Sequence, residues 1–130
     1  MKEVEYNGDN EDNQLKSLLS SSKKSLERKI RELTRELENR QKISNNILTT
    51  LQTAKLQLED KLWRLRYSSM FNEAFIVNRD FMRQIQRIEE QISAESISNF
   101  QDTLKLKIKL QEITEELDLE YQKLKLLEFD

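Results

Sequence analysis

Apolar residues recur at every third or fourth position over most of the chain, which is the spacing of an amphipathic α-helix. Between residues 19 and 65 this stripe has 14 positions, of which ten are apolar. Such a narrow stripe is typical of a coiled coil, because one partner helix is enough to cover it. The stripe therefore predicts an oligomer seam formed by Leu19, Leu26, Ile30, Leu33, Leu37, Ile47, Leu51, Ala54, Leu58 and Leu65.

The seam is interrupted at four of its positions, which hold Lys23, Arg40, Ser44 and Lys61. Two of the interruptions are consecutive, at Arg40 and Ser44, and Ile43 stands just off the stripe. A change of spacing in a coiled-coil repeat shifts the seam around the helix. We therefore expect a local shift of register, or loose packing, between residues 40 and 44.

The helical spacing continues from residue 70 to residue 92 and again from about 99 to 128. Within the last segment, Leu104 and Ile108 stand off the main stripe and form a second apolar face. A helix that is apolar on two sides suits a bundle of three or more helices better than a two-stranded coil.

The position at which the chain turns back is left open by the pattern. The segment 93–98 contains three serines, and serine favours helix caps and turns, so a break there is the preferred interpretation. A hairpin that turns near 68–72 is the second alternative, because the spacing on its two sides is nearly the same read forwards and backwards. A chain without a sharp turn is the third.

These patterns predict an all-α protein: an elongated coiled coil or a helical hairpin of long helices, which is oligomeric. Residues 1–14 are polar and acidic and are expected to form a disordered tail. A long coiled-coil helix is expected over 15–92, with a possible break near 68–72. A serine-rich turn at 93–98 and a C-terminal helix over 99–130 complete the expected organisation.

Composition narrows the range of functions. The 130 residues include no proline, cysteine or histidine and only one glycine, Gly8. A fold with many tight turns normally uses several glycines and prolines, so a sandwich, barrel or doubly wound sheet is not expected. Disulfide bonds, thiolate nucleophiles, imidazole bases and histidine metal ligands are excluded. Adjacent acidic residues diverge around a helix and do not converge on one ligand. We expect no enzymatic activity, no metal, no cofactor and no small-molecule ligand.

Charge is distributed unevenly along the chain. Residues 15–66 hold 13 basic and 6 acidic side chains, and residues 93–130 hold 5 basic and 9 acidic ones. The two segments are therefore expected to lie near one another. A basic face away from the seam could contact the phosphates of nucleic acid without sequence preference, or could be a solvated face. The residues of this face are Lys24, Arg28, Arg31, Arg35 and Lys42.

A cluster of large apolar side chains lies around the middle of the chain. Aromatic residues and methionine are enriched at the centres of protein interfaces, and this cluster exceeds what a two-helix seam buries. It is interpreted as a partner-docking surface, with core packing as the alternative. The candidate docking residues are Trp63, Tyr67, Met70, Phe71, Phe75 and Phe81.

No apolar run approaches the length of about 18 residues that suggests a membrane span. Residues 1–6 lack the apolar core of a signal peptide. The protein is expected to be intracellular, in the nucleus or the cytoplasm, with the nucleus favoured, and no membrane partner is expected.

In composition and periodicity the chain resembles the small coiled-coil subunits of eukaryotic chromosome-associated assemblies, such as kinetochore or meiotic-axis complexes. The resemblance implies a non-enzymatic structural or adaptor subunit that self-associates and docks partner subunits. Expected partners are the chain itself, other coiled-coil proteins, or both. Two alternatives remain: a coiled-coil tether or adaptor subunit of membrane traffic, and a coiled coil that binds DNA weakly through the basic face.

Overall fold

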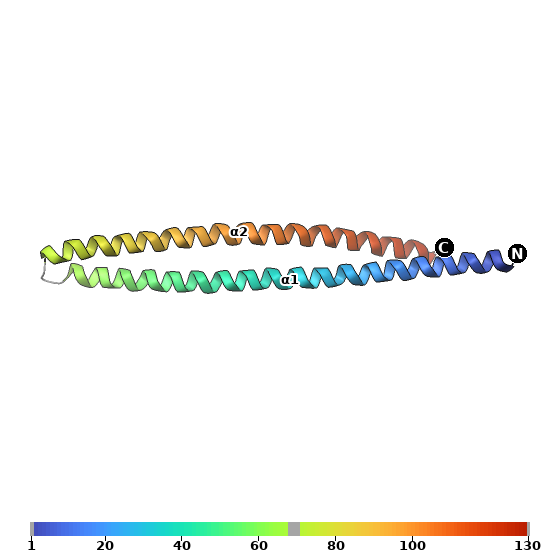
Figure 1. The fold of residues 1–130 in the computed structure, drawn as a ribbon, viewed down its shortest axis with the longest axis horizontal. Coiled ribbons are helices and arrows are strands. Elements are labelled where there is room, and N and C mark those ends of the chain that lie inside the picture. Colours follow the sequence, from blue (N-terminus) through green and yellow to red (C-terminus); the bar gives the residue numbers. More distant parts are fainter. Residues whose placement is uncertain (1, 68–70, 130) are drawn as a thin grey trace. The chain divides into compact units, whose positions relative to one another are not determined.

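The computed structural model of the protein describes the backbone of residues 2–67 and 71–129, and the side chains of residues 11–67 and 78–128. It contains two helices, α1 (Lys2–Arg66) and α2 (Phe71–Phe129) (Figure 1). The predicted all-α fold is confirmed, because every described residue except Tyr67 is helical. Neither helix contains, within these ranges, a stretch long and apolar enough to cross a membrane.

The residues that fill the two helices explain why they form. Leucine, glutamate, lysine, arginine and glutamine are strong helix formers, and the chain has no proline to interrupt them. At the end of α1, Arg64 and Arg66 place positive charge where the helix dipole is negative. The backbone N–H of Tyr67 donates to the carbonyl of Arg64 at 3.3 Å, which tightens the last turn.

The structure divides into two units, each of which pairs a segment of α1 with a segment of α2. Unit 1 comprises Met1–Glu38 and Leu104–Asp130, and unit 2 comprises Asn39–Thr103. Figure 1 shows α1 and α2 running in opposite directions within each pair. In unit 1, Tyr121 Oη donates to Glu27 Oε1 at 3.0 Å, and in unit 2, Lys55 Nζ lies 3.2 Å from Glu89 Oε1.

The predicted seam of α1 is turned towards α2 of the same chain. Leu26 in unit 1 and Leu62 in unit 2 are buried, and most of the other apolar seam positions are half-buried. Because a single chain is present, only α2 can cover these side chains. The stripe therefore packs within the chain here.

The seam changes register between residues 40 and 48, a stretch that includes the shift predicted between residues 40 and 44. The first inward-facing positions of α1 in unit 2 are Arg40, Ser44, Leu48 and Leu51, so two consecutive spacings of four replace the usual alternation of three and four. Such an insertion of four residues moves the stripe around the helix. As a result, Ile47, a predicted seam residue, is exposed and Leu48 takes its place.

The expected turn at 93–98 is corrected by the structure, in which α2 is helical through this segment. The interruption lies between Arg66 and Phe71, at the position of the second alternative. Serine has only a weak bias against helix, and long-range contacts override it. Glu95 provides such a contact, because its carboxylate pairs with Arg40 of α1.

The N-terminal segment also differs from the expected disordered tail. The backbone is helical from Lys2, so residues 2–14 belong to α1.

Candidate functional site

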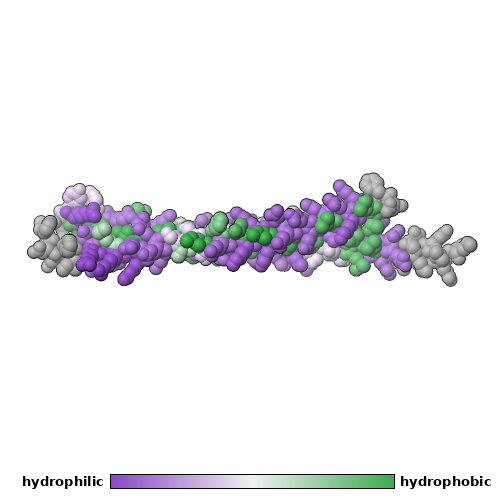
Figure 2. All heavy atoms as spheres, turned by 90° about the horizontal axis from the view of Figure 1, so that it is seen from above, coloured by the Kyte–Doolittle hydropathy of each residue, from purple (hydrophilic) through white to green (hydrophobic). Residues whose placement is uncertain are grey.

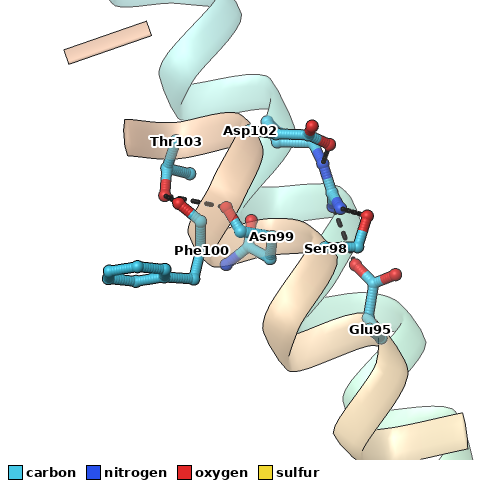
Figure 3. Close-up of polar contacts among 7 residues, drawn as sticks. Glu95, Ser98, Asn99, Phe100, Asp102 and Thr103 are labelled. Carbon is cyan, nitrogen blue, oxygen red and sulfur yellow. Dashed lines mark hydrogen bonds and ion pairs between the residues drawn. The ribbon is translucent and has the colours of Figure 1, made fainter. Parts of the chain in front are cut away.

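A polar cluster lies in the seam of unit 2, around the side chain of Arg40. The Nε atom of Arg40 donates to Asp102 Oδ2 at 2.9 Å, one terminal nitrogen donates to Glu95 Oε1 at 2.8 Å, and the other lies 3.4 Å from Ser98 Oγ. Figure 3 shows Glu95, Ser98 and Asp102 on consecutive turns of α2, all directed at one point. The spacing of three and four residues places these partners on one helix face.

The cluster fixes the ionisation of its members. The side chains of Arg40 and Glu95 are only 18% and 16% exposed, whereas Asp102 is 48% exposed. Hydrogen bonds to Glu95 and Asp102 raise the pKa of Arg40. The hydrogen bond from Arg40 lowers the pKa of Glu95 below its ordinary value. Both groups are therefore charged at neutral pH and form a fixed ion pair, which is a poor arrangement for proton transfer.

Other polar side chains surround the ion pair. Thr103 is buried, and its Oγ1 donates to the backbone carbonyl of Asn99 at 2.8 Å (Figure 3). Ser44 is 1% exposed and its Oγ has no hydrogen-bond partner. The Oδ1 of Asn99 also lacks a partner. Unit 2 thus contains a polar layer in its seam.

The polar layer restricts how α1 and α2 can be aligned with each other in unit 2. In coiled coils, a polar residue at a seam position specifies register at a cost in stability. A buried charge that loses its partner is strongly destabilising, so only an alignment that keeps Arg40 beside its carboxylates is tolerated.

Across the residues that the structure describes, there is no group of three or more histidine, cysteine or acidic side chains that could hold a metal ion.

The predicted docking residues are placed in part. Trp63 and Tyr67 are 60% and 75% exposed, and their ring centroids lie 4.6 Å apart at an interplanar angle of 48°. Phe81 is half-buried against the seam. Met70 lies outside the described residues, as do the side chains of Phe71 and Phe75. Trp63 and Tyr67 therefore form an exposed aromatic pair at the end of α1.

The predicted basic face is exposed at all five of its positions. Lys24, Arg28, Arg31 and Arg35 lie on α1 in unit 1, and Lys42 lies on α1 in unit 2. Within the described part of the chain, none of these five side chains takes part in an ion pair. Their charge is consequently available to a partner outside the chain.

Sequence reasoning found only part of an apolar stripe on α2 in unit 1. We call this stripe the outer face of α2. Leu104 and Ile108 belong to it, as the sequence indicates, but so do Leu119 and Leu126, and all four are exposed. Figure 2 shows hydrophobic residues at the surface among hydrophilic ones. The stripe repeats at spacings of 4, 3 and 4 residues and comprises Leu104, Ile108, Gln111, Glu115, Leu119, Gln122 and Leu126.

Comparison with known proteins adds no relative: no protein-family model, no curated protein and no solved structure matches the chain.

Proposed function

We infer that the protein is a non-enzymatic coiled-coil subunit that self-associates and docks partner proteins in a larger assembly. The observation that carries this inference is the imbalance between buried and exposed apolar side chains. Among the described residues, only Leu26 and Leu62 are buried hydrophobics, whereas fifteen large hydrophobic side chains are exposed.

The extent of exposed surface supports an interaction function. The chain exposes 10759 Å² of accessible surface. A folded globular monomer of 15.6 kDa exposes roughly 7,300 Å² by the usual scaling with mass. The chain therefore exposes more total surface than a compact monomer of its mass. Burial of the apolar part of this surface in an interface would release free energy of about 25 cal/mol per Å², which favours association.

Self-association is tested by the dependence of stability on concentration. We expect the melting temperature, followed by circular dichroism, to rise with protein concentration, because association stabilises the folded state by mass action. Light scattering should give a mass above 15.6 kDa. A monomeric mass together with a melt independent of concentration would remove self-association from the proposal.

Docking of partner proteins is tested at the exposed aromatic pair. The chain with Trp63→Ala and Tyr67→Ala is compared with the wild type as bait in affinity purification. Because aromatic anchors carry much of the energy of an interface, partners that use this surface should be lost at a cost of about 2 kcal/mol or more. A chain with Leu56→Ala, which alters another exposed side chain of α1, serves as the control.

The identity of the captured proteins decides the type of assembly. The resemblance to the coiled-coil subunits of chromosome-associated assemblies favours an assembly of the kinetochore or meiotic-axis type, and hence a nuclear location. Membrane-traffic tether subunits among the captured proteins would favour the alternative. If the aromatic substitutions abolish helicity as well as capture, the pair stabilises the fold and is not a docking site.

Nucleic-acid binding through the basic face is the second candidate, favoured by the lack of ion pairing of its five residues in the described part of the chain. Binding to phosphates weakens steeply with salt, and each lost phosphate contact lowers the slope of the logarithm of affinity against salt concentration by about 1. We expect Arg28→Gln with Arg31→Gln to reduce the slope, whereas Lys105→Gln on α2 leaves it unchanged. Undetectable DNA binding at low salt would exclude this candidate.

A further inference from the structure

The outer face of α2 in unit 1 is a second apolar stripe, and its four apolar side chains are exposed within the described part of the chain. Leu104 is 44% exposed, Ile108 48%, Leu119 55% and Leu126 68%. Its spacings of 4, 3 and 4 add up to repeats of eleven residues, or about 3.67 residues per turn. Because this period is close to the 3.6 residues of the α-helix, the stripe runs nearly parallel to the helix axis. A straight stripe of this kind matches a helix that lies along it.

The charges beside the stripe are arranged in blocks of opposite sign. Lys105, Lys109, Glu112 and Glu116 follow one another at spacings of 4, 3 and 4, so they share one flank of the outer face. The two lysines precede the two glutamates along the helix. This flank is therefore positive towards the N-terminal side of Gln111 and negative towards the C-terminal side.

Within the described residues, these four charged side chains have no ion-pair partner. All four are exposed, and in the described part of the molecule none of them forms an ion pair. The two polar residues at the centre of the outer face contact each other only weakly, with Gln111 Nε2 at 3.4 Å from Glu115 Oε1. The flank is thus free to pair with charges supplied by another helix.

A second copy of α2 supplies those charges when it runs antiparallel. If two copies meet about a two-fold axis at Gln111, Leu104 of each copy lies level with Leu119 of the other, to within a residue. The same axis brings Lys105 level with Glu116 and Lys109 level with Glu112, within the same margin. In antiparallel helix pairs the same flank of both copies meets, because the two-fold axis preserves the side on which a residue lies. Opposite charges therefore face each other at every level of this flank.

Other arrangements of two copies are less favourable. In a parallel pair in register the two-fold axis runs along the helices, so opposite flanks of the two copies meet. Lys105 and Lys109 of one copy would then lie near Lys107 of the other, and Glu116 would lie near Asp118. Such contacts between like charges are repulsive. The basic face of α1 would meet both the lysine block and the glutamate block of the outer face. Complementarity along the whole flank is obtained by the antiparallel pair of α2 helices.

We propose that the outer face of α2 is the surface through which two copies of this chain associate, antiparallel and centred on Gln111. The proposal rests on the inferred self-association and assigns it to a surface and an orientation. The seam of each chain stays closed within the chain, and the two α2 helices form the centre of the dimer in this region.

The apolar part of the surface is tested by Leu104→Glu combined with Leu119→Glu in the full-length chain. Both side chains are exposed, so helicity should be retained, while the dimer dissociation constant from analytical ultracentrifugation should increase by about 30-fold or more, as for loss of a central anchor. The control combines Leu18→Glu with Leu56→Glu, which are also exposed leucines but lie on α1. An unchanged dissociation constant for the α2 variant would overturn the proposal.

The charge pattern gives a test that is independent of apolar burial. Lys105→Glu with Lys109→Glu makes the flank uniformly negative, and Glu112→Lys with Glu116→Lys makes it uniformly positive, so each pair of substitutions should weaken the dimer. The chain with all four substitutions regains opposite charges at each level and should regain dimerisation. Failure of the fourfold variant to recover would show that the flank does not pair in this way.

Orientation is tested with single cysteines, since the natural sequence has none. A short bis-maleimide should link two copies of the Gln111→Cys chain, because that position meets itself at the axis. The Leu104→Cys chain should be linked to the Leu119→Cys chain in a mixture and not to itself. Self-linking at all three positions would indicate a parallel pair and would contradict the antiparallel contact.

The outcomes separate the two proposals. A wild-type chain that stays monomeric at all concentrations contradicts self-association and, with it, the α2 contact. If the wild type dimerises and none of the α2 substitutions weakens the dimer, self-association stands. Only its assignment to the outer face of α2 is then overturned. In that case the dimer is held by another face, such as that of the exposed aromatic pair.

Discussion

Arg40 is a charged residue at a position where the repeat expects an apolar one, and its partners restrict how α1 and α2 can be aligned in unit 2. Sliding α2 by seven residues in one direction would bring Asp102 to the place of Glu95 and Lys109 to the place of Asp102. Sliding it the other way would bring Ile88 to the place of Glu95. Either alignment leaves Arg40 with one carboxylate where it now has two, which disfavours slippage.

Leu26 should be among the most sensitive positions of the seam. Leu26 is only 7% exposed. Leu26→Ala therefore removes buried apolar surface and should lower the free energy of unfolding by about 2–5 kcal/mol. Leu56 is 64% exposed. Leu56→Ala should change that free energy by about 0.5 kcal/mol at most. Urea denaturation at one protein concentration measures both, and equal losses would contradict the assignment of the seam.

The ion pair of Glu95 should make stability depend on acid pH. The pKa of Glu95 is lowered in the folded state, so its contribution to stability is full above the pKa of the unfolded chain and is lost as the pH falls through the folded value. The pKa of glutamate in an unfolded chain is about 4.3, so the loss of this stabilisation should begin near that pH. The melting temperatures of the wild type and Glu95→Gln should differ at pH 7 and converge as the pH falls below the lowered pKa that Glu95 has in the folded state.

The exposed residue Glu90 provides the matched control for this titration, because it lies on α2 outside the polar layer and forms no ion pair within the described residues. The Glu90→Gln chain should follow the wild type at every pH. If the difference between wild type and Glu95→Gln is the same at pH 7 and at pH 3, the ionised carboxylate of Glu95 does not stabilise the fold.

At the scale of elements, the continuity of α2 through 93–98 has a direct consequence. Ser96 is exposed in the interior of the helix, so proline there removes a backbone hydrogen bond and clashes with the preceding turn. We expect Ser96→Pro to lower the free energy of unfolding by about 3 kcal/mol or more, measured by urea denaturation. Ser96→Ala is the control and should be neutral or slightly stabilising. A Ser96→Pro chain as stable as the wild type would restore the turn at 93–98.

The helical pattern was predictable because it is local, and the place of the interruption was not. Both 67–70 and 93–98 contain serines and lack proline and glycine, so propensity hardly distinguishes them. What separates them is the contact between Arg40 and Glu95, residues that lie 55 positions apart in the chain. No window of neighbouring residues contains that information.

The outer face of α2 was predicted only at Leu104 and Ile108 for a related reason. Its eleven-residue repeat runs beside the seven-residue repeat of the inner stripe, and polar residues occupy three of its seven positions. In the sequence alone, Leu119 and Leu126 therefore look like isolated apolar residues. The structure assigns them to the outer face, because Leu117 and Leu124, which are half-buried, belong to the other apolar stripe of α2. The polar layer was visible as interruptions at Arg40 and Ser44, but its partners on α2 were not.

At the scale of the whole molecule, the ion pairs that join α1 to α2 in the described part of the chain all have the same polarity. Lys55 pairs with Glu89, and Arg40 pairs with Glu95 and Asp102, so each cation lies on α1 and each anion on α2. The excess of basic residues in 15–66 and of acidic residues in 93–130 therefore has a counterpart in the contacts of unit 2. Such partly exposed pairs contribute modestly to stability, and their larger effect is on the pairing of the two helices.

The single connection between α1 and α2 sets an order in which the chain can fold. Contacts of unit 2 enclose shorter loops, such as the 62 residues between Arg40 and Asp102, than the 94 residues between Glu27 and Tyr121 in unit 1. For the unfolded chain, the free-energy cost of closing these two loops differs by under about 0.5 kcal/mol. Once unit 2 has formed, however, the ends of unit 1 are already close, so closing unit 1 costs little further entropy. Native-state hydrogen exchange should accordingly give lower opening free energies for amides in 11–38 and 104–128 than for those in 39–66 and 78–103. Equal values throughout would indicate that both units unfold in one cooperative step. The expected difference would mean that unit 1 folds last and unfolds first.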